Sequence, residues 1–180
     1  KSTVASPLAR MFAASHIRSD VVRKDLMGVS GATPDAWRSG IYAEDVTDAT
    51  YERMIDLGRE AVDAGRPAVL DATFLDPRWR EAAAAMAREA GVPFLLVETV
   101  TDDAVLERRL EARTRAGADP SDADVAVMRR QREALAAEPV SVPAGALAVR
   151  IDTTPEGYVD LDPALAALRD AGVVVGRIDA

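Results

Sequence analysis

The first three residues, Lys1, Ser2 and Thr3, have the order in which a phosphate-binding loop ends. Such loops follow the pattern G-x-x-x-x-G-K-[ST], in which backbone amides surround the phosphates, the lysine reaches the β- and γ-phosphates and the hydroxyl ligates Mg²⁺. If these residues end such a loop, an apolar strand and a glycine-rich turn precede Lys1. The alternative is that Lys-Ser-Thr stands here by accident, and the tripeptide alone does not decide between the two.

The segment "IRSDVVRKDL" places an acid and a base three residues apart, Asp20 and Arg23. At the start of a helix this spacing puts both side chains on one face. A carboxylate there can accept the proton of an acceptor hydroxyl, while the arginine holds the acceptor or the transferring phosphoryl group. The alternative is an N-cap aspartate with a surface ion pair, which is the simpler interpretation when the segment is taken alone.

The segment "AVLDATF" ends an apolar run with an aspartate, Asp71. An aspartate at the end of a buried strand lies at the carboxyl edge of the sheet, where ligand sites of α/β proteins form. There it can hold a water of a Mg²⁺ shell or orient the hydroxyl of the phosphate-binding loop. The alternative is an ordinary capping or turn aspartate.

A cluster of arginines surrounds the segment "AGADPSDAD", whose glycine, proline and acidic residues predict a hinge-like loop. Arginines on a closing segment can neutralise the charge of a transferring phosphoryl group. A solvated helix face with ordinary i,i+4 ion pairs explains some of them equally well. The cluster comprises Arg108, Arg109, Arg113, Arg115, Arg129, Arg130 and Arg132.

Strands alternate with helices along the chain, which indicates a three-layer α/β protein with a parallel sheet. The patterns predict strands at residues 16–18, 66–73, 92–100 and 146–152, and a further edge strand at 173–180. They also predict helices at residues 3–14, 46–64, 77–90, 102–115 and 161–172. Two more helices are expected. One is capped by Ser19 or Asp20 and ends at residue 27, and the other is capped by Ser121 or Asp122 and ends near residue 137. A turn-rich surface loop is expected around residues 28–37.

Composition limits the classes of function. With 180 residues the chain is expected to form one domain, residues 1–180. The lack of cysteine excludes disulfides and thiolate sites and favours a cytoplasmic protein. The single histidine, His16, cannot build a histidine metal site and is expected to be packed in the fold. A net charge of -8 argues against binding duplex nucleic acid, and no apolar run suggests a membrane span.

Taken in order, "KST", "IRSDVVRK", "LDATF", "DPRWREAA", the arginine-rich segment with "SDAD", and "IDTTP" resemble a family of P-loop kinases. This family is often described as AAA-family ATPases or predicted kinases and is related to gluconate kinase, polynucleotide kinase, chloramphenicol phosphotransferase and zeta toxin. The resemblance implies a P-loop NTPase fold with strand order 2-3-1-4-5 and a helical lid, at about residues 108–132. The first, central strand of that order would precede Lys1.

The resemblance also implies roles for the phosphate-binding and catalytic residues. Lys1 would bind the β- and γ-phosphates, Ser2 would ligate Mg²⁺ and Thr3 would line the α- and β-phosphates. Asp20 matches the general base of a D-x-x-R motif, and Arg23 matches its phosphate or acceptor clamp.

Further residues of the resemblance complete the expected nucleotide site. Asp71 matches a Walker B-like carboxylate near Mg²⁺, and Arg109 and Arg113 match lid arginines. Residues 152–155, among them Asp152 and Thr154, would fall near the adenine.

The function implied is transfer of the γ-phosphoryl group of ATP, with Mg²⁺, to a hydroxyl of a small molecule. Two alternatives stay open: a nucleotide-binding regulatory ATPase module without such an acceptor, and a polynucleotide 5′-hydroxyl kinase. In many relatives the domain is the C-terminal half of a bifunctional protein whose N-terminal half resembles aminoglycoside phosphotransferases, so such a domain is an expected partner within the same protein.

Overall fold

The computed structural model describes residues 1–28, 42–116, 139–155 and 157–173. These residues divide into two compact units, one of Ala5–Ala72 and one of Lys1–Val4 with Thr73–Ala180. The helix α1 (Ser2–Met11) begins in the second unit and continues in the first.

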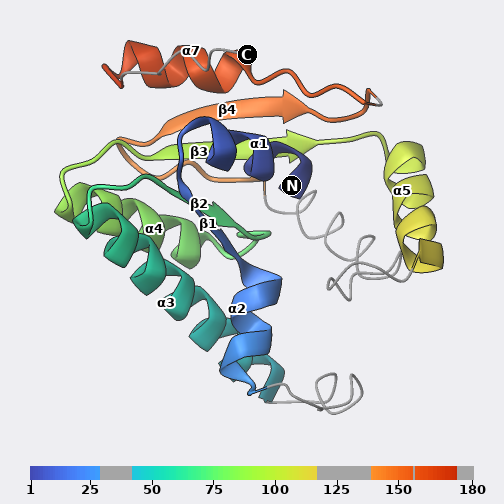
Figure 1. Ribbon diagram of the computed structural model, residues 1–180, viewed down its shortest axis with the longest axis horizontal. Coiled ribbons are helices and arrows are strands. Elements are labelled where there is room, and N and C mark those ends of the chain that lie inside the picture. Colours follow the sequence, from blue (N-terminus) through green and yellow to red (C-terminus); the bar gives the residue numbers. More distant parts are fainter. Residues whose placement is uncertain (29–41, 117–138, 156, 174–180) are drawn as a thin grey trace. The chain divides into compact units, whose positions relative to one another are not determined.

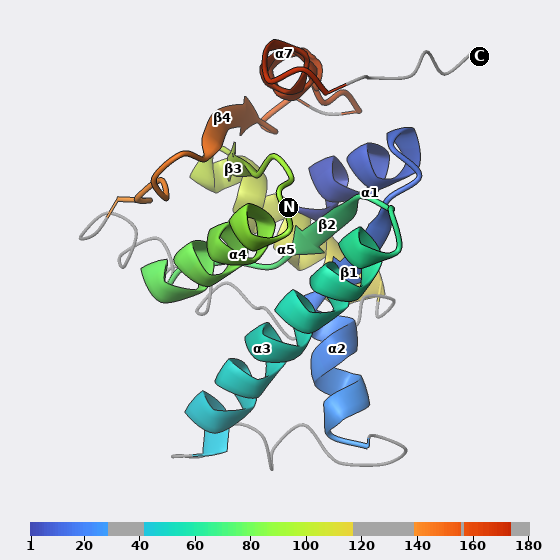
Figure 2. The same cartoon turned by 90° about the vertical axis from the view of Figure 1, so that its left-hand side faces the viewer.

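The first unit is built on two parallel strands and the helices that follow them. Strand β1 (Ser15–Arg18) pairs with β2 (Ala68–Asp71), and the register places Arg18 opposite Asp71 at the carboxyl end. Helix α3 (Tyr42–Asp63) packs against both strands and against α2 (Ser19–Leu26) (Figure 1 and Figure 2). The core between these elements is apolar, and its buried members include Ile17, Val22, Tyr51 and Met54.

Strand β1 runs directly into α2 without a loop. Arg18 is both the last residue of the strand and the N-cap of the helix, with extended backbone angles of φ -102° and ψ 129° and no capping bond from its side chain. The prediction that Ser19 or Asp20 caps this helix is therefore wrong. Because the strand already supplies the extended residue that an N-cap requires, the helix begins at Ser19 and Asp20 lies inside its first turn.

The second unit contains the other pair of parallel strands. Strand β3 (Leu95–Val100) pairs with β4 (Leu147–Asp152), and helix α7 (Asp162–Asp170) packs against both. Helix α4 (Pro77–Glu89) precedes β3, and helix α5 (Asp103–Ala116) follows it. Asp76 caps α4 by accepting a hydrogen bond from the backbone N–H of Arg78.

A buried arginine in α4 fixes the segment that follows β2. The side chain of Arg80 is only 2% exposed and donates hydrogen bonds to the carbonyls of Phe74 and Leu75 and to the carbonyl and hydroxyl of Ser141. Four oxygen acceptors thus satisfy a buried cation, as burial of a charge requires. This network joins the start of α4 to the segment that leads into β4.

The observed elements confirm the α/β class and most expected boundaries. The described residues form two separate two-stranded parallel sheets, β1–β2 and β3–β4. In the expected order 2-3-1-4-5 these pairs would be strands 2 and 3 and strands 4 and 5, and that order stays a prediction. The position of that first strand stays a prediction. Among the described residues, no helix is both long enough and apolar enough to cross a membrane.

Several expectations concern residues outside those that the structure describes. They are the surface loop beyond residue 28, the lid beyond residue 116 with the helix at about 121–137, and the edge strand at 173–180 beyond its first residue. These remain predictions from the sequence.

Candidate active site

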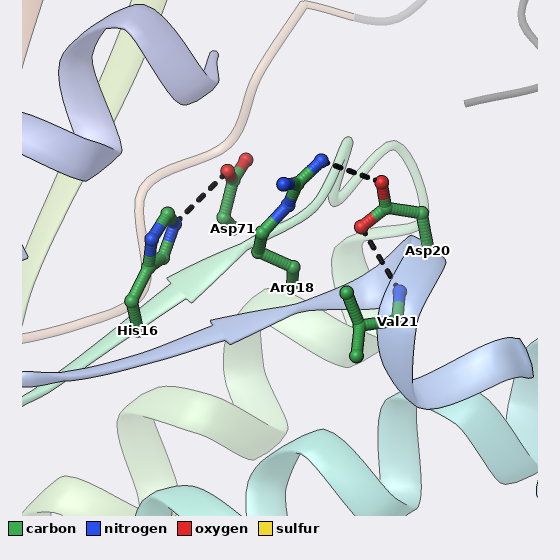
Figure 3. Close-up of polar contacts among 5 residues, drawn as sticks. All are labelled: His16, Arg18, Asp20, Val21 and Asp71. Atoms are coloured by element: carbon green, nitrogen blue, oxygen red, sulfur yellow. Dashed lines mark hydrogen bonds and ion pairs between the residues drawn. The ribbon is translucent and has the colours of Figure 1, made fainter. Parts of the chain in front are cut away.

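The carboxyl ends of β1 and β2 gather two basic and two acidic side chains. Side chains of a strand alternate between its two sides, and Ile17 points into the core with 7% exposure. His16 and Arg18 therefore share the opposite side of β1. Figure 3 shows both directed toward carboxylates at this edge.

The first of these pairs joins His16 to Asp71. The Nε2 atom of His16 lies 3.2 Å from Oδ2 of Asp71, across the two paired strands (Figure 3). The Asp71 side chain is 3% exposed and that of His16 is 21% exposed. A buried carboxylate requires polar partners, and His16 supplies one of them.

The second pair joins Arg18 to Asp20 across the strand-to-helix junction. The Nη2 atom of Arg18 donates to Oδ2 of Asp20 over 2.6 Å, and the backbone N–H of Val21 donates to Oδ1 over 3.0 Å. The side chains of Arg18 and Asp20 are 33% and 20% exposed. Both oxygens of Asp20 are therefore held, and the helix N-terminus adds a favourable field for the carboxylate.

The predicted clamp, Arg23, lies one helical turn beyond Asp20 in α2 and is half-buried. Its Nε atom is buried and has no hydrogen-bond partner among the described residues, and the same is true of Nε of Arg18. Within the part of the chain that the structure describes, Asp20 pairs with Arg18 and not with Arg23. The guanidinium group of Arg23 is thus not occupied by the carboxylate next to it on the helix.

Lys1, Ser2 and Thr3 lie at the beginning of α1, where all three are exposed. The carbonyl of Lys1 accepts the backbone N–H of Val4 over 2.8 Å, so the chain enters the helix at once. A helix N-terminus is a favourable position for a bound phosphate. These residues belong to the second unit, whereas Asp20, Arg23 and Asp71 belong to the first.

A separate cluster forms at the carboxyl ends of β3 and β4. The hydroxyls of Thr101 and Thr153 contact each other, the backbone N–H of Asp102 donates to Oγ1 of Thr154 over 3.0 Å, and the backbone N–H of Thr154 donates to Oδ1 of Asp152 over 2.8 Å. Hydrogen bonds from Thr154 hold the pKa of Asp152 below its ordinary value. The turn after β4 is therefore tightly organised.

Helix α5 contributes an arginine to this turn. Nη2 of Arg109 donates to the carbonyls of Thr154 and Pro155 over 3.4 and 3.3 Å. The structure thus brings together Arg109, Asp152 and Thr154, three residues predicted from the resemblance. Arg113 lies further along the same helix, and its side chain is outside the described part.

Asp71 is the described residue whose chemistry best suits a magnesium site in the first unit. Mg²⁺ in phosphoryl-transfer sites usually has one or two protein carboxylates, with the remaining positions taken by waters and phosphates. A single buried carboxylate at a strand end fits that requirement. Among the described residues, no three His, Cys, Asp or Glu side chains form a group that could hold a metal ion.

Two polar residues of this edge were missed by the sequence interpretation. Arg18 has no role in that interpretation, and His16, which is expected to be packed in the fold, also contacts Asp71. The alternation around the apolar Ile17 was the available signal, because it places both basic side chains on the side away from the core.

The chain matches a known protein family over most of its length. A family model described as an AAA domain matches residues 1–138. The chain belongs to this family. It is also 31% identical over 139 residues to uncharacterised proteins of Mycobacterium tuberculosis strain H37Rv and Mycobacterium bovis strain AF2122/97. That match covers 74% of the chain but 27% of each relative, so the chain spans about a quarter of their length.

Solved structures show the same fold. A kinase candidate from Chloroflexus aurantiacus J-10-fl is similar with a TM-score of 0.69 and 17% identity, over 94% of this chain and 90% of that one. A tunicamycin resistance protein of Deinococcus radiodurans is similar with a TM-score of 0.56 and 15% identity, over 97% and 93%. The AAA domain protein therefore has the α/β fold of P-loop kinase-like nucleotide-binding proteins, which confirms the predicted family and fold class.

Proposed function

We propose that this AAA domain protein transfers the γ-phosphoryl group of ATP to a hydroxyl group of a small molecule. The observation that carries the proposal is the Asp20 carboxylate, held through both oxygens at the strand-to-helix junction of the first unit, where β1 and β2 also end with the buried Asp71. A switch that only binds or hydrolyses nucleotide has no need of an acceptor base. An aspartate in this position therefore favours an enzyme with a hydroxyl acceptor.

The O–H bond of the acceptor breaks and its proton moves to the Asp20 carboxylate, which acts as general base. The acceptor oxygen forms a bond to the γ-phosphorus, and the bond from that phosphorus to the β–γ bridging oxygen breaks, leaving its electron pair on ADP. Arg23, whose guanidinium group is not paired with Asp20, would bind the acceptor or the transferring group.

The residues that would hold the nucleotide are those that the resemblance implies. Lys1 and Thr3 would contact phosphates, and Ser2 with Asp71 would hold Mg²⁺, which neutralises phosphate charge when bound. Residues 152–155 would border the adenine, with Arg109 supporting that turn through its two carbonyl contacts. Arg113 would bind phosphate from α5.

The test is single-turnover phosphorylation by the full-length protein. A panel of hydroxylated metabolites is first screened for ADP release, and the best acceptor is then used with the wild type and with Asp20→Asn. Loss of the base is expected to lower the rate about 10²- to 10⁴-fold. Asp25→Asn, an exposed aspartate on the same helix, is the matched control and should keep the wild-type rate. Transfer by D20N at the wild-type rate would remove Asp20 as the base.

The same screen separates the alternatives. ATP binding without acceptor-stimulated ADP release across the panel would favour a regulatory module, and release stimulated by single-stranded oligonucleotides with a 5′-hydroxyl would favour a polynucleotide kinase. A small-molecule acceptor is the preferred proposal because the net charge of -8 disfavours a polyanionic partner. A phosphotransferase-like domain elsewhere in the full protein and a cytoplasmic location are further parts of the proposal.

A further inference from the structure

We infer that Arg18 is a positioning residue for Asp20, which it holds in the orientation that proton transfer requires. The inference rests on the proposed function, because it assigns Arg18 a role in the reaction that Asp20 would catalyse. It goes beyond the D-x-x-R pattern, in which the arginine that accompanies the aspartate is Arg23.

The position of Arg18 in the chain makes the contact with Asp20 a local one. Arg18 is the N-cap of α2, yet its side chain makes no capping bond and instead reaches Asp20 two residues ahead. Because β1 continues into α2 without a loop, the strand fixes the backbone from which the guanidinium extends. The first turn of the helix fixes the backbone of its partner in the same way.

Two donors define the orientation of the carboxylate. Nη2 of Arg18 donates a hydrogen bond to Oδ2, and the backbone N–H of Val21 donates one to Oδ1 (Figure 3). Rotation about the bond that carries the carboxylate would therefore break at least one hydrogen bond. Each oxygen retains a lone pair that can accept a proton. Without Arg18, the neighbouring Val21 N–H would be the remaining donor among the contacts that the structure gives for Asp20.

The burial of the pair distinguishes it from an ordinary surface ion pair. Exposed pairs contribute little because water competes for both partners. Here the side chains are 33% and 20% exposed, whereas those of Arg53 and Glu60 on α3 are 42% and 63% exposed over a similar separation of 2.9 Å. The latter pair lies in the same unit and provides a matched control.

The test is a double-mutant cycle in the full-length protein, using the acceptor found in the metabolite screen. Arg18→Met is expected to lower kcat about 10- to 100-fold while changing KM for ATP less than about twofold, because binding of the nucleotide does not depend on Asp20. Arg18→Lys, which keeps the charge but not the planar fork, should restore part of the rate. In the D20N background, R18M should lower the rate no further, because Arg18 acts through Asp20. The control Arg53→Met should match the wild type.

Two kinetic results would overturn the inference. One is an R18M rate within about twofold of the wild type while D20N is inactive. The other is an equal fold-loss on adding R18M in the wild-type and D20N backgrounds, which would mean that Arg18 acts independently of Asp20.

A structural readout keeps the inference testable if the wild type phosphorylates no acceptor, a result that would count against the proposed function alone. Crystal structures of the wild type and R18M are then compared. An Asp20 carboxylate turned away from the Val21 N–H in R18M supports the inference, and an unchanged carboxylate overturns it.

Discussion

At the scale of single residues, the edge of the β1–β2 pair is organised by two basic side chains that each hold one carboxylate. His16 contacts Asp71 and Arg18 contacts Asp20, both from the side of β1 opposite the buried Ile17. The two pairs differ in burial, since Asp71 is nearly inaccessible to solvent and Asp20 is partly exposed. We therefore expect the His16 contact to act mainly on the stability of the fold, and the Arg18 contact to act mainly on the orientation of the Asp20 carboxylate.

Replacing His16 tests the first of these expectations. His16→Leu removes a donor from a buried carboxylate and should lower the free energy of unfolding by about 1–2 kcal/mol, as expected for a hydrogen bond to a charged group in a partly exposed pair. His16→Gln keeps an amide donor and should lose less. Urea denaturation followed by circular dichroism measures both, and equal losses for the two variants would show that the hydrogen bond contributes little.

At the scale of elements, most of the secondary structure could be predicted because hydrophobic spacing is a local property. The apolar runs that became β3 and β4 and the proline at the start of α4 are direct signals. The beginning of α2 could not be placed correctly, because its N-cap is defined by the extended backbone at the end of β1 and not by a capping side chain. The contact of Arg18 with Asp20 depends on that junction and was missed for the same reason.

The cap of α4 allows a prediction with a pH dependence. Partial burial raises the pKa of Asp76, but hydrogen bonds from the backbone and guanidinium of Arg78 outweigh this effect and hold the pKa below its ordinary value. A lowered pKa in the folded state means that the carboxylate stabilises the protein above about pH 4, the pKa of an unfolded aspartate, and that this contribution disappears as the pH falls through the folded pKa.

Two substitutions separate the cap from its charge. Asp76→Ala should lower the free energy of unfolding at pH 7 by about 1 kcal/mol, the usual effect of removing an N-cap. Asp76→Asn should retain most of the stability at pH 7 and lose the part of the acid dependence that Asp76 supplies. Denaturation curves at pH 7 and at pH 3 for the three proteins measure this, and an identical pH dependence for wild type and D76N would contradict the prediction.

At the scale of the whole molecule, the family and the fold could be predicted from a few short motifs because each motif lies at an element boundary. Lys1 and Ser2 stand at the start of α1, Asp71 ends β2 and Asp152 ends β4. The identity of the acceptor could not be predicted, because the segment expected to border its pocket, beyond residue 28, has no pattern that selects one substrate.

Linkage between ligand binding and unfolding tests the nucleotide site without an acceptor. If ATP with Mg²⁺ binds the folded full-length protein alone, a concentration about 100 times Kd should add about 2.7 kcal/mol to the free energy of unfolding. Lys1→Ala should remove most of this stabilisation, and D20N should keep it because the role proposed for Asp20 is toward the acceptor and not the nucleotide. Thermal unfolding with and without ATP and Mg²⁺ provides the measurement. Equal stabilisation of wild type and K1A would argue against a phosphate contact from Lys1.

The direct passage from β1 into α2 also limits how this region can change during evolution. One residue inserted after Arg18 would either rotate the helix by about 100°, since an α-helix has 3.6 residues per turn, or shift the strand so that its side chains exchange sides. Both outcomes would separate the guanidinium from the carboxylate that it holds. Relatives that keep this pair should therefore vary in length after α2 or before β1, but not between positions 18 and 20, and an alignment gap there would indicate a different geometry at this strand-to-helix junction.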